Sequence, residues 1–141
     1  MFWFECWHIS TPECRRRIAA ASRGKAKSSY RSFYLDVDAD CEFCDIRSKL
    51  VGPIESTEIV DPDFQRTAEY RGVPFARLGM RITVAGDPGR IVGKNSSANF
   101  DVMFDGGPHS GLVLNCHPNW QTRYFDARGE LLADFVKAAN A

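Results

Sequence analysis

The stretch GMRITVAGDPGRIVG, residues 79–93, decides the fold of the second half of the chain. Apolar and polar residues alternate over residues 80–84, which is the period of a half-buried β-strand. The tetrapeptide Gly-Asp-Pro-Gly at 86–89 predicts a turn, because proline fixes one backbone dihedral and glycine permits positive φ. The apolar pair Ile91-Val92 follows, so the stretch predicts two antiparallel strands joined by a tight turn.

Short alternating runs continue beyond this hairpin. Residues 100–104 alternate, residues 112–114 extend the pattern, and residues 120–124 form a further run. Turn residues separate these runs at intervals of about ten residues, which predicts five short strands in a small barrel or sandwich. The final apolar residues, LLADFV at 131–136, indicate a short amphipathic helix that closes the chain.

The front of the chain predicts a strand–helix–strand unit. Residues 2–9 are aromatic-rich and alternate, as expected for a strand that is covered on both faces. Residues 10–13, Ser-Thr-Pro-Glu, have the order of a helix start, and we expect the helix to run to about Tyr34. A second strand is expected over residues 45–51, pairing with the first strand and ending at Pro53.

These elements predict an α+β protein in three parts. Residues 1–53 form the strand–helix–strand unit, and residues 79–141 form the five-stranded β-structure with its C-terminal helix. The polar, proline-punctuated residues 54–78 are expected to connect the two.

Composition excludes several classes of protein. The chain has 141 residues, of which 44% are hydrophobic and 12% aromatic, unlike a disordered tail or a collagen-like fibre. No apolar run approaches the roughly 20 residues that cross a bilayer, and residues 1–6 lack the features of a signal peptide. We therefore expect a cytoplasmic protein that does not engage a membrane.

Charge is distributed unevenly, although 18 basic and 18 acidic residues cancel overall. Residues 1–35 carry seven basic and two acidic groups, residues 36–78 carry five and ten, and residues 79–141 carry six of each. Such asymmetry is typical of an interaction surface, but the two oppositely charged segments can equally neutralise each other in the fold.

A basic arc is the first candidate binding site. On a continuous helix, Arg16, Arg23, Lys27 and Arg31 share one side, where four cations can follow a phosphate backbone. Tyr30 lies close enough in sequence to offer a stacking surface. The alternative is an ordinary solvated helix face.

Two loops of the β-structure form the second candidate site, because they concentrate polar and aromatic residues. Its members are Lys94, Asn95, His117 and Trp120. Loops at the mouth of a barrel are where such folds place ligands. Asparagine is also favoured for purely structural reasons in turns, and Trp120 suits either the core or an exposed anchor.

The five cysteines and three histidines are the candidates for metal binding and nucleophilic catalysis. Cys41-x-x-Cys44 has the spacing of half a zinc site, and Cys6, His8 and Cys14 could supply the other half. Buried free thiols explain the same residues. Cys116 and His117 are adjacent, so on a strand their side chains point to opposite faces and cannot form a dyad. We expect no cofactor and no enzymatic activity.

Residues 79–93 resemble the opening of KOW and related SH3-like barrels, which begin with an apolar alternating strand, a glycine turn and a second strand led by Gly-x-Val or its equivalent. Residues 99–105 and 114–120, with the front segment 22–27, resemble small proteins of phages and prophages. The resemblance to KOW-type barrels implies a five-stranded SH3-like barrel and non-catalytic binding, because those barrels contact RNA, ribosomal or polymerase surfaces. The resemblance to phage proteins implies a location in the host cytoplasm.

Three functions follow, in order of preference. The first is a non-enzymatic phage or prophage protein that binds a nucleic acid or nucleoprotein complex through the basic helix and the barrel loops. The second is a protein-binding antagonist of a host machine, such as a host-defence inhibitor of anti-CRISPR type, which binds a single host protein. The third is a small zinc-dependent module.

Overall fold

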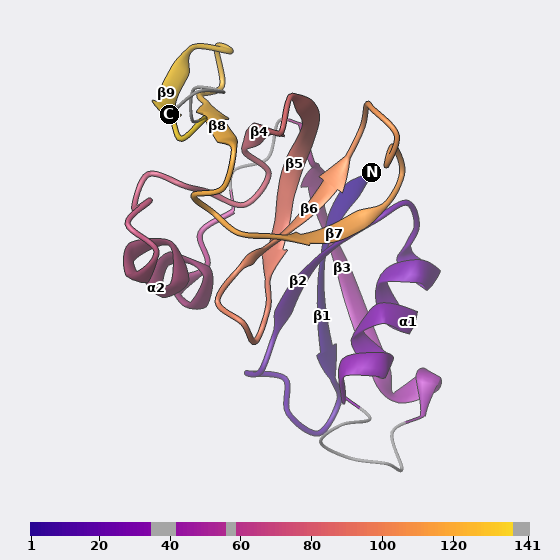
Figure 1. The fold of residues 1–141 in the computed structure, drawn as a ribbon. Helices are drawn as coiled ribbons and strands as arrows, with labels where there is room; N and C mark the ends of the chain where they lie inside the picture. The colour runs from indigo at the N-terminus through magenta and orange to yellow at the C-terminus, as the bar shows by residue number, and fades with distance from the viewer. Residues whose placement is uncertain (35–41, 56–58, 137–141) are drawn as a thin grey trace. The chain divides into compact units, whose positions relative to one another are not determined.

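The computed structural model describes residues 1–34, 42–55 and 59–136, and the chain divides into two compact units, residues 1–57 and 58–141 (Figure 1). The first unit contains β1 (Phe2–His8), β2 (Arg16–Ala20), α1 (Arg23–Tyr34), the 3₁₀ turn η1 (Phe43–Asp45) and β3 (Ile46–Pro53). The second contains α2 (Pro62–Tyr70), β4 (Arg81–Val84), β5 (Asp87–Lys94), β6 (Phe100–Phe104), β7 (Val113–Cys116), β8 (Thr122–Phe125) and β9 (Leu131–Asp134). The predicted α+β class is confirmed.

The first unit is a three-stranded antiparallel sheet in the order β2-β1-β3, with α1 packed on one face. In the register, Cys6 of β1 lies opposite Arg16 of β2 and Ser48 of β3. The predicted strand at the N-terminus and its partner ending at Pro53 are both confirmed.

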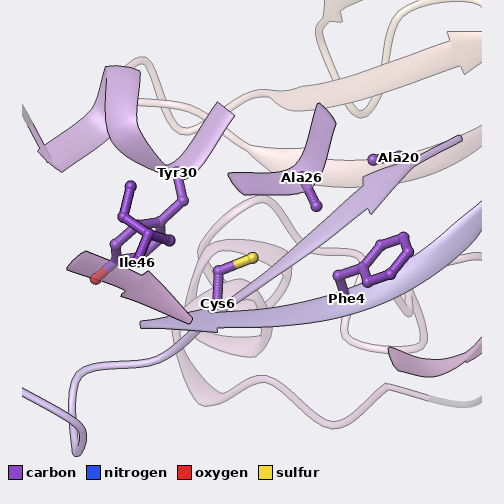
Figure 2. Close-up of a cluster of buried hydrophobic side chains, with 6 residues drawn as sticks. All are labelled: Phe4, Cys6, Ala20, Ala26, Tyr30 and Ile46. Carbon is purple, nitrogen blue, oxygen red and sulfur yellow. The ribbon is translucent and has the colours of Figure 1, made fainter. Parts of the chain in front are cut away.

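A hydrophobic cluster fastens α1 to this sheet (Figure 2). Each element except η1 contributes to it, through Phe4, Cys6, Ala20, Ala26, Tyr30 and Ile46. Tyr30 and Ala26 point from the helix toward the strands, and Cys6 points from β1 toward the helix. Because side chains alternate along a strand, this packing assigns the intervening residues of β1 to the opposite face of the sheet.

The predicted helix from residues 10–13 to Tyr34 is wrong in its first half, because Arg16–Ala20 is β2 and α1 begins at Arg23. Ser22 stands just before the helix, and its hydroxyl accepts from the Lys25 amide at 3.3 Å. Residues 16–20, Arg-Arg-Ile-Ala-Ala, do not alternate polar and apolar side chains, so the sequence alone gives no strand signal here. Pairing with β1 supplies backbone hydrogen bonds that decide for the strand.

The second unit contains a six-stranded antiparallel sheet in the order β7-β6-β5-β4-β8-β9. Strands β4 to β7 form a meander, after which the chain returns and places β8 beside β4. Strands β7 and β9 are the two edges, so the sheet formed by the described residues is not closed into a barrel. The expected closure is therefore not seen.

The turn inside the stretch 79–93 lies earlier than predicted. Ala85 and Gly86 connect β4 to β5 with φ values of 50° and 87°. Two-residue hairpin loops of type I′ need positive φ at both positions, which Gly86 adopts without steric cost. Pro88 and Gly89, expected in the turn, already belong to β5.

Residues 54–78, expected to be a connector, contain α2, and the boundary between the units falls at residues 57–58. Asp61 caps the helix by accepting from the amides of Asp63 (3.0 Å) and Phe64 (3.4 Å). The Phe64 ring lies 4.9 Å from the ring of Phe100 on β6, so α2 packs into the second unit.

The C-terminal helix expected at 131–136 is also wrong, because Leu131–Asp134 is β9 and pairs with β8. An ion pair of 3.2 Å between Arg123 Nε and Asp134 Oδ2 joins the two strands. A short apolar run is compatible with both the helical and the strand period, and here pairing with β8 makes it a strand.

Candidate nucleic-acid interface

The predicted basic arc is not a continuous ridge. Arg16 lies on the edge strand β2, whereas Arg23 and Lys27 lie on α1. The Arg23 guanidinium donates to the carbonyl and the hydroxyl of Ser48, and the Lys27 ammonium lies 4.8 Å from the centroid of the Phe43 ring. Arg23 and Lys27 therefore brace α1 against β3 and η1.

The other two members of that site also have structural positions. Tyr30 is 1% exposed and belongs to the hydrophobic cluster, so its ring cannot stack on a ligand. Arg31 lies in the last turn of α1, where a cation is stabilised by the helix dipole.

A different group of cations gathers on the sheet face opposite α1. The register places Arg17 and Lys49 on either side of Glu5, and Arg47 beside Trp7. Cross-strand neighbours share a face, so these side chains project together. We call this group, with Arg15 from the loop before β2, the cationic sheet face: Glu5, Trp7, Arg15, Arg17, Arg47 and Lys49.

Arg15 contacts both Glu5 and Trp7 of the cationic sheet face. Its Nη1 donates to Glu5 Oε1 at 3.0 Å and its Nε to the Pro12 carbonyl at 2.9 Å, while the guanidinium lies 4.0 Å from the centroid of the Trp7 ring. Within the described ranges, Arg17 and Lys49 have no ion-pair partner. The face thus sets four cations against one carboxylate.

In the second unit, Arg71 at the end of α2 holds two loops together. Its Nε donates to the Ala98 carbonyl at 2.8 Å, and its Nη2 to the Ser97 carbonyl and Asn99 Oδ1, both at 3.0 Å. Its Nη1 lies 3.3 Å from His117 Nε2. These partners are neutral oxygens and an imidazole, so the positive charge is not cancelled by any of them.

The loop at residues 117–121 is fixed from several sides. The Trp120 amide donates to the His117 carbonyl at 3.2 Å, and the Tyr124 hydroxyl donates to the Pro118 carbonyl at 2.6 Å. Asn119 Nδ2 donates to the Arg71 carbonyl at 3.0 Å. Burial raises the pKa of Tyr124, which keeps its hydroxyl protonated as a donor.

Beside this loop is a hollow of about 400 Å³, within the usual range of ligand pockets. We call it the Trp120 hollow; its lining residues are His117, Asn119, Trp120, Gln121 and Phe135. Trp120 is 58% exposed, so the indole is not a core plug. The structure brings His117 and Trp120 of the predicted loop site together here.

The other two residues of the predicted loop site are not among the residues lining the hollow. Asn95 Oδ1 accepts from the amides of Ser97 and Asn99, and its Nδ2 donates to Asp101 at 3.0 Å, so this side chain shapes its own loop. Lys94 is the exposed last residue of β5.

The predicted zinc ligands do not converge in the described part of the chain, which holds no group of three or more metal-ligating side chains. Cys6 is buried in the hydrophobic cluster, and burial raises the pKa of its thiol to about 11. His8 Nε2 lies 3.9 Å from Asp45 Oδ2, and Cys44 Sγ lies 3.9 Å from Asp45 Oδ1. Cys41 lies outside the described residues.

Comparison of the chain with protein-family models, curated proteins and solved structures found no match. Among the helices described, none is long and apolar enough to span a membrane. The cationic sheet face and the Trp120 hollow are the two candidate binding sites of the described residues.

Proposed function

We propose that this chain binds single-stranded nucleic acid through the cationic sheet face. The observation that carries the proposal is the excess of cations there, four basic side chains around one carboxylate and a tryptophan. Each phosphate neutralised by lysine or arginine releases counterions, which supplies affinity without sequence preference.

The arrangement on the sheet favours an unpaired strand as the ligand. Arg47 and Lys49 are two residues apart on β3, which places them about 6.6 Å apart along the strand, and Arg17 lies across the sheet. Trp7 adds an aromatic ring that is stacked with Arg15. A positive surface interleaved with aromatic groups is the usual means of holding single strands.

Binding, and not catalysis, is the activity that the side chains favour. The Trp120 hollow is lined by an imidazole, two amides and two aromatic rings, a set suited to recognition. Cys6 is buried against α1, where no substrate reaches it.

The return of β8 to β4 supports reading the second unit as an SH3-like module. The meander β4 to β7, followed by a further strand placed beside β4, is the strand order that supports this reading. We also propose that the protein comes from a phage or prophage, which the resemblance of residues 99–105 and 114–120 implies. An acidic surface of a host protein is the competing ligand, and the binding experiment separates the two.

Neutralising Arg17 and Lys49 together tests the proposed function. We expect the Arg17→Gln, Lys49→Gln double variant to bind a labelled single strand about tenfold or more weakly at 0.1 M salt, because two phosphate contacts are lost. Fluorescence anisotropy measures the affinity. Glutamine removes the charge but keeps a polar side chain, and unlike glutamate it introduces no repulsion with Glu5.

The matched control is the double variant Lys25→Gln, Arg128→Gln, which removes two exposed cations elsewhere. We expect its affinity to stay within threefold of the wild-type chain. Equal affinity of both double variants would refute the proposed surface. A wild-type chain that binds no nucleic acid but captures one acidic host protein would favour the antagonist function.

A further inference from the structure

We propose that the Trp120 hollow binds one unstacked base of the nucleic-acid strand, an inference that rests on the proposed function and extends it to the second unit. Base-binding sites in proteins combine an exposed aromatic face with polar groups that pair with base edges. The hollow has both kinds of group.

The indole of Trp120 provides the stacking surface. A tryptophan with 58% exposure contributes little to the core, which here is formed by buried residues such as Phe100 and Tyr124. Phe135 lines the same hollow, so a planar ligand meets aromatic surface from two residues. Every base has a π-face, which makes stacking tolerant of sequence.

The polar groups come from neighbouring positions on the same loop. The Asn119 Nδ2 donates to the Arg71 carbonyl and its Oδ1 is buried, so this side chain holds the loop in place. The Gln121 side chain has no hydrogen-bond partner in the part of the chain that the structure describes, so its donor and acceptor remain available to a base edge.

Charge beside the hollow favours an anionic ligand over a neutral one. Arg71 touches His117, a lining residue, and its other acceptors are neutral oxygens. A guanidinium paired in this way keeps its positive potential, which attracts the phosphate that accompanies a base.

The loop at residues 117–121 is also preorganised, because hydrogen bonds within the chain hold it without a ligand. The Pro118 and Trp120 carbonyls accept from the Tyr124 and Thr122 hydroxyls. The Asn119 side chain donates to the Arg71 carbonyl, so the backbone that carries the indole is held from both sides. A preorganised site spends little of its binding energy on ordering, which strengthens the binding of a small group such as a base.

The test compares random 12-nucleotide single strands, as RNA and as DNA, with a strand of the same length whose bases are absent. We expect Trp120→Ala to weaken binding of the base-containing strands by about 5- to 150-fold, the usual loss for one stacked base, and to leave the abasic strand unaffected. Trp120→Phe should recover most of the loss. Leu112→Ala, which removes an equally exposed apolar side chain, is the control and should change neither.

The outcomes separate this inference from the proposed function. Unchanged binding of all strands by Trp120→Ala overturns the inference, while loss of binding by the Arg17→Gln, Lys49→Gln variant upholds the cationic sheet face. A base-dependent effect of Trp120→Ala without any effect of the sheet variant supports the hollow and overturns the face. If the wild-type chain binds no strand, both are overturned.

Discussion

Replacing Phe100 with alanine is expected to lower the free energy of unfolding of the second unit by about 3–5 kcal/mol, the usual cost of removing a buried phenylalanine. Phe100 is 1% exposed on β6, and its ring packs against Phe64 of α2. The substitution leaves a cavity where the helix meets the sheet. Urea denaturation followed by circular dichroism measures the change.

Val113→Ala is the matched control for this prediction. Val113 lies on the adjacent strand β7 but is exposed, so its truncation should change the unfolding free energy by less than about 0.5 kcal/mol. A loss below about 1 kcal/mol for Phe100→Ala would contradict the packing of α2 on this sheet.

Cys6 is expected to react with iodoacetamide at least about 100-fold more slowly than Cys14 in the folded chain at pH 8. Burial raises the pKa of the Cys6 thiol from 9.0 to about 11, an effect that nearby Lys27 and Arg23 only partly offset. The shift lowers the thiolate fraction, and the cluster around Cys6 excludes the reagent. Cys14 and Cys44 are exposed. Peptide mapping by mass spectrometry gives the three rates.

The same thiol makes stability depend on pH at the alkaline end. Between pH 9.0 and about 11 the unfolded chain loses the Cys6 proton while the folded chain keeps it. The stabilising contribution is therefore complete below pH 9.0 and is lost as the pH rises toward 11.

For the reactivity prediction, alkylation in urea serves as the control, since all thiols should then react alike. Equal rates for Cys6 and Cys14 in the folded chain would contradict the burial.

Local sequence patterns predict those strands and helices whose type does not depend on pairing with another part of the chain. The alternation in residues 2–9 and the Gly52-Pro53 stop identified β1 and the end of β3. The helix start predicted at residues 10–13 is wrong, because residues 16–20 show no alternation and become a strand only by pairing with β1. The start of α2 was present as Asp61-Pro62, a cap followed by proline, but the polar composition around it concealed the signal.

The candidate site was less accessible to sequence reasoning, since it depends on register. Arg17 and Lys49 are 32 positions apart in the chain and become neighbours only because each pairs with Glu5. The exposure of Trp120 depends on how loop 117–121 is held by Arg71 and Tyr124, which no local pattern records. The sequence does predict His117 and Trp120 as candidates, because loops of small β-structures concentrate polar and aromatic groups.

If phosphates contact the cationic sheet face, the dependence of binding on salt concentration changes when its cations are removed. Plotting the logarithm of the association constant against the logarithm of salt concentration gives a slope of about −0.7 for each phosphate neutralised on a single strand. We predict that Arg17→Gln and Lys49→Gln each make the slope about 0.7 less negative, and that Lys25→Gln on α1 leaves it unchanged. A slope that responds to Lys25→Gln and ignores both sheet substitutions would contradict the account.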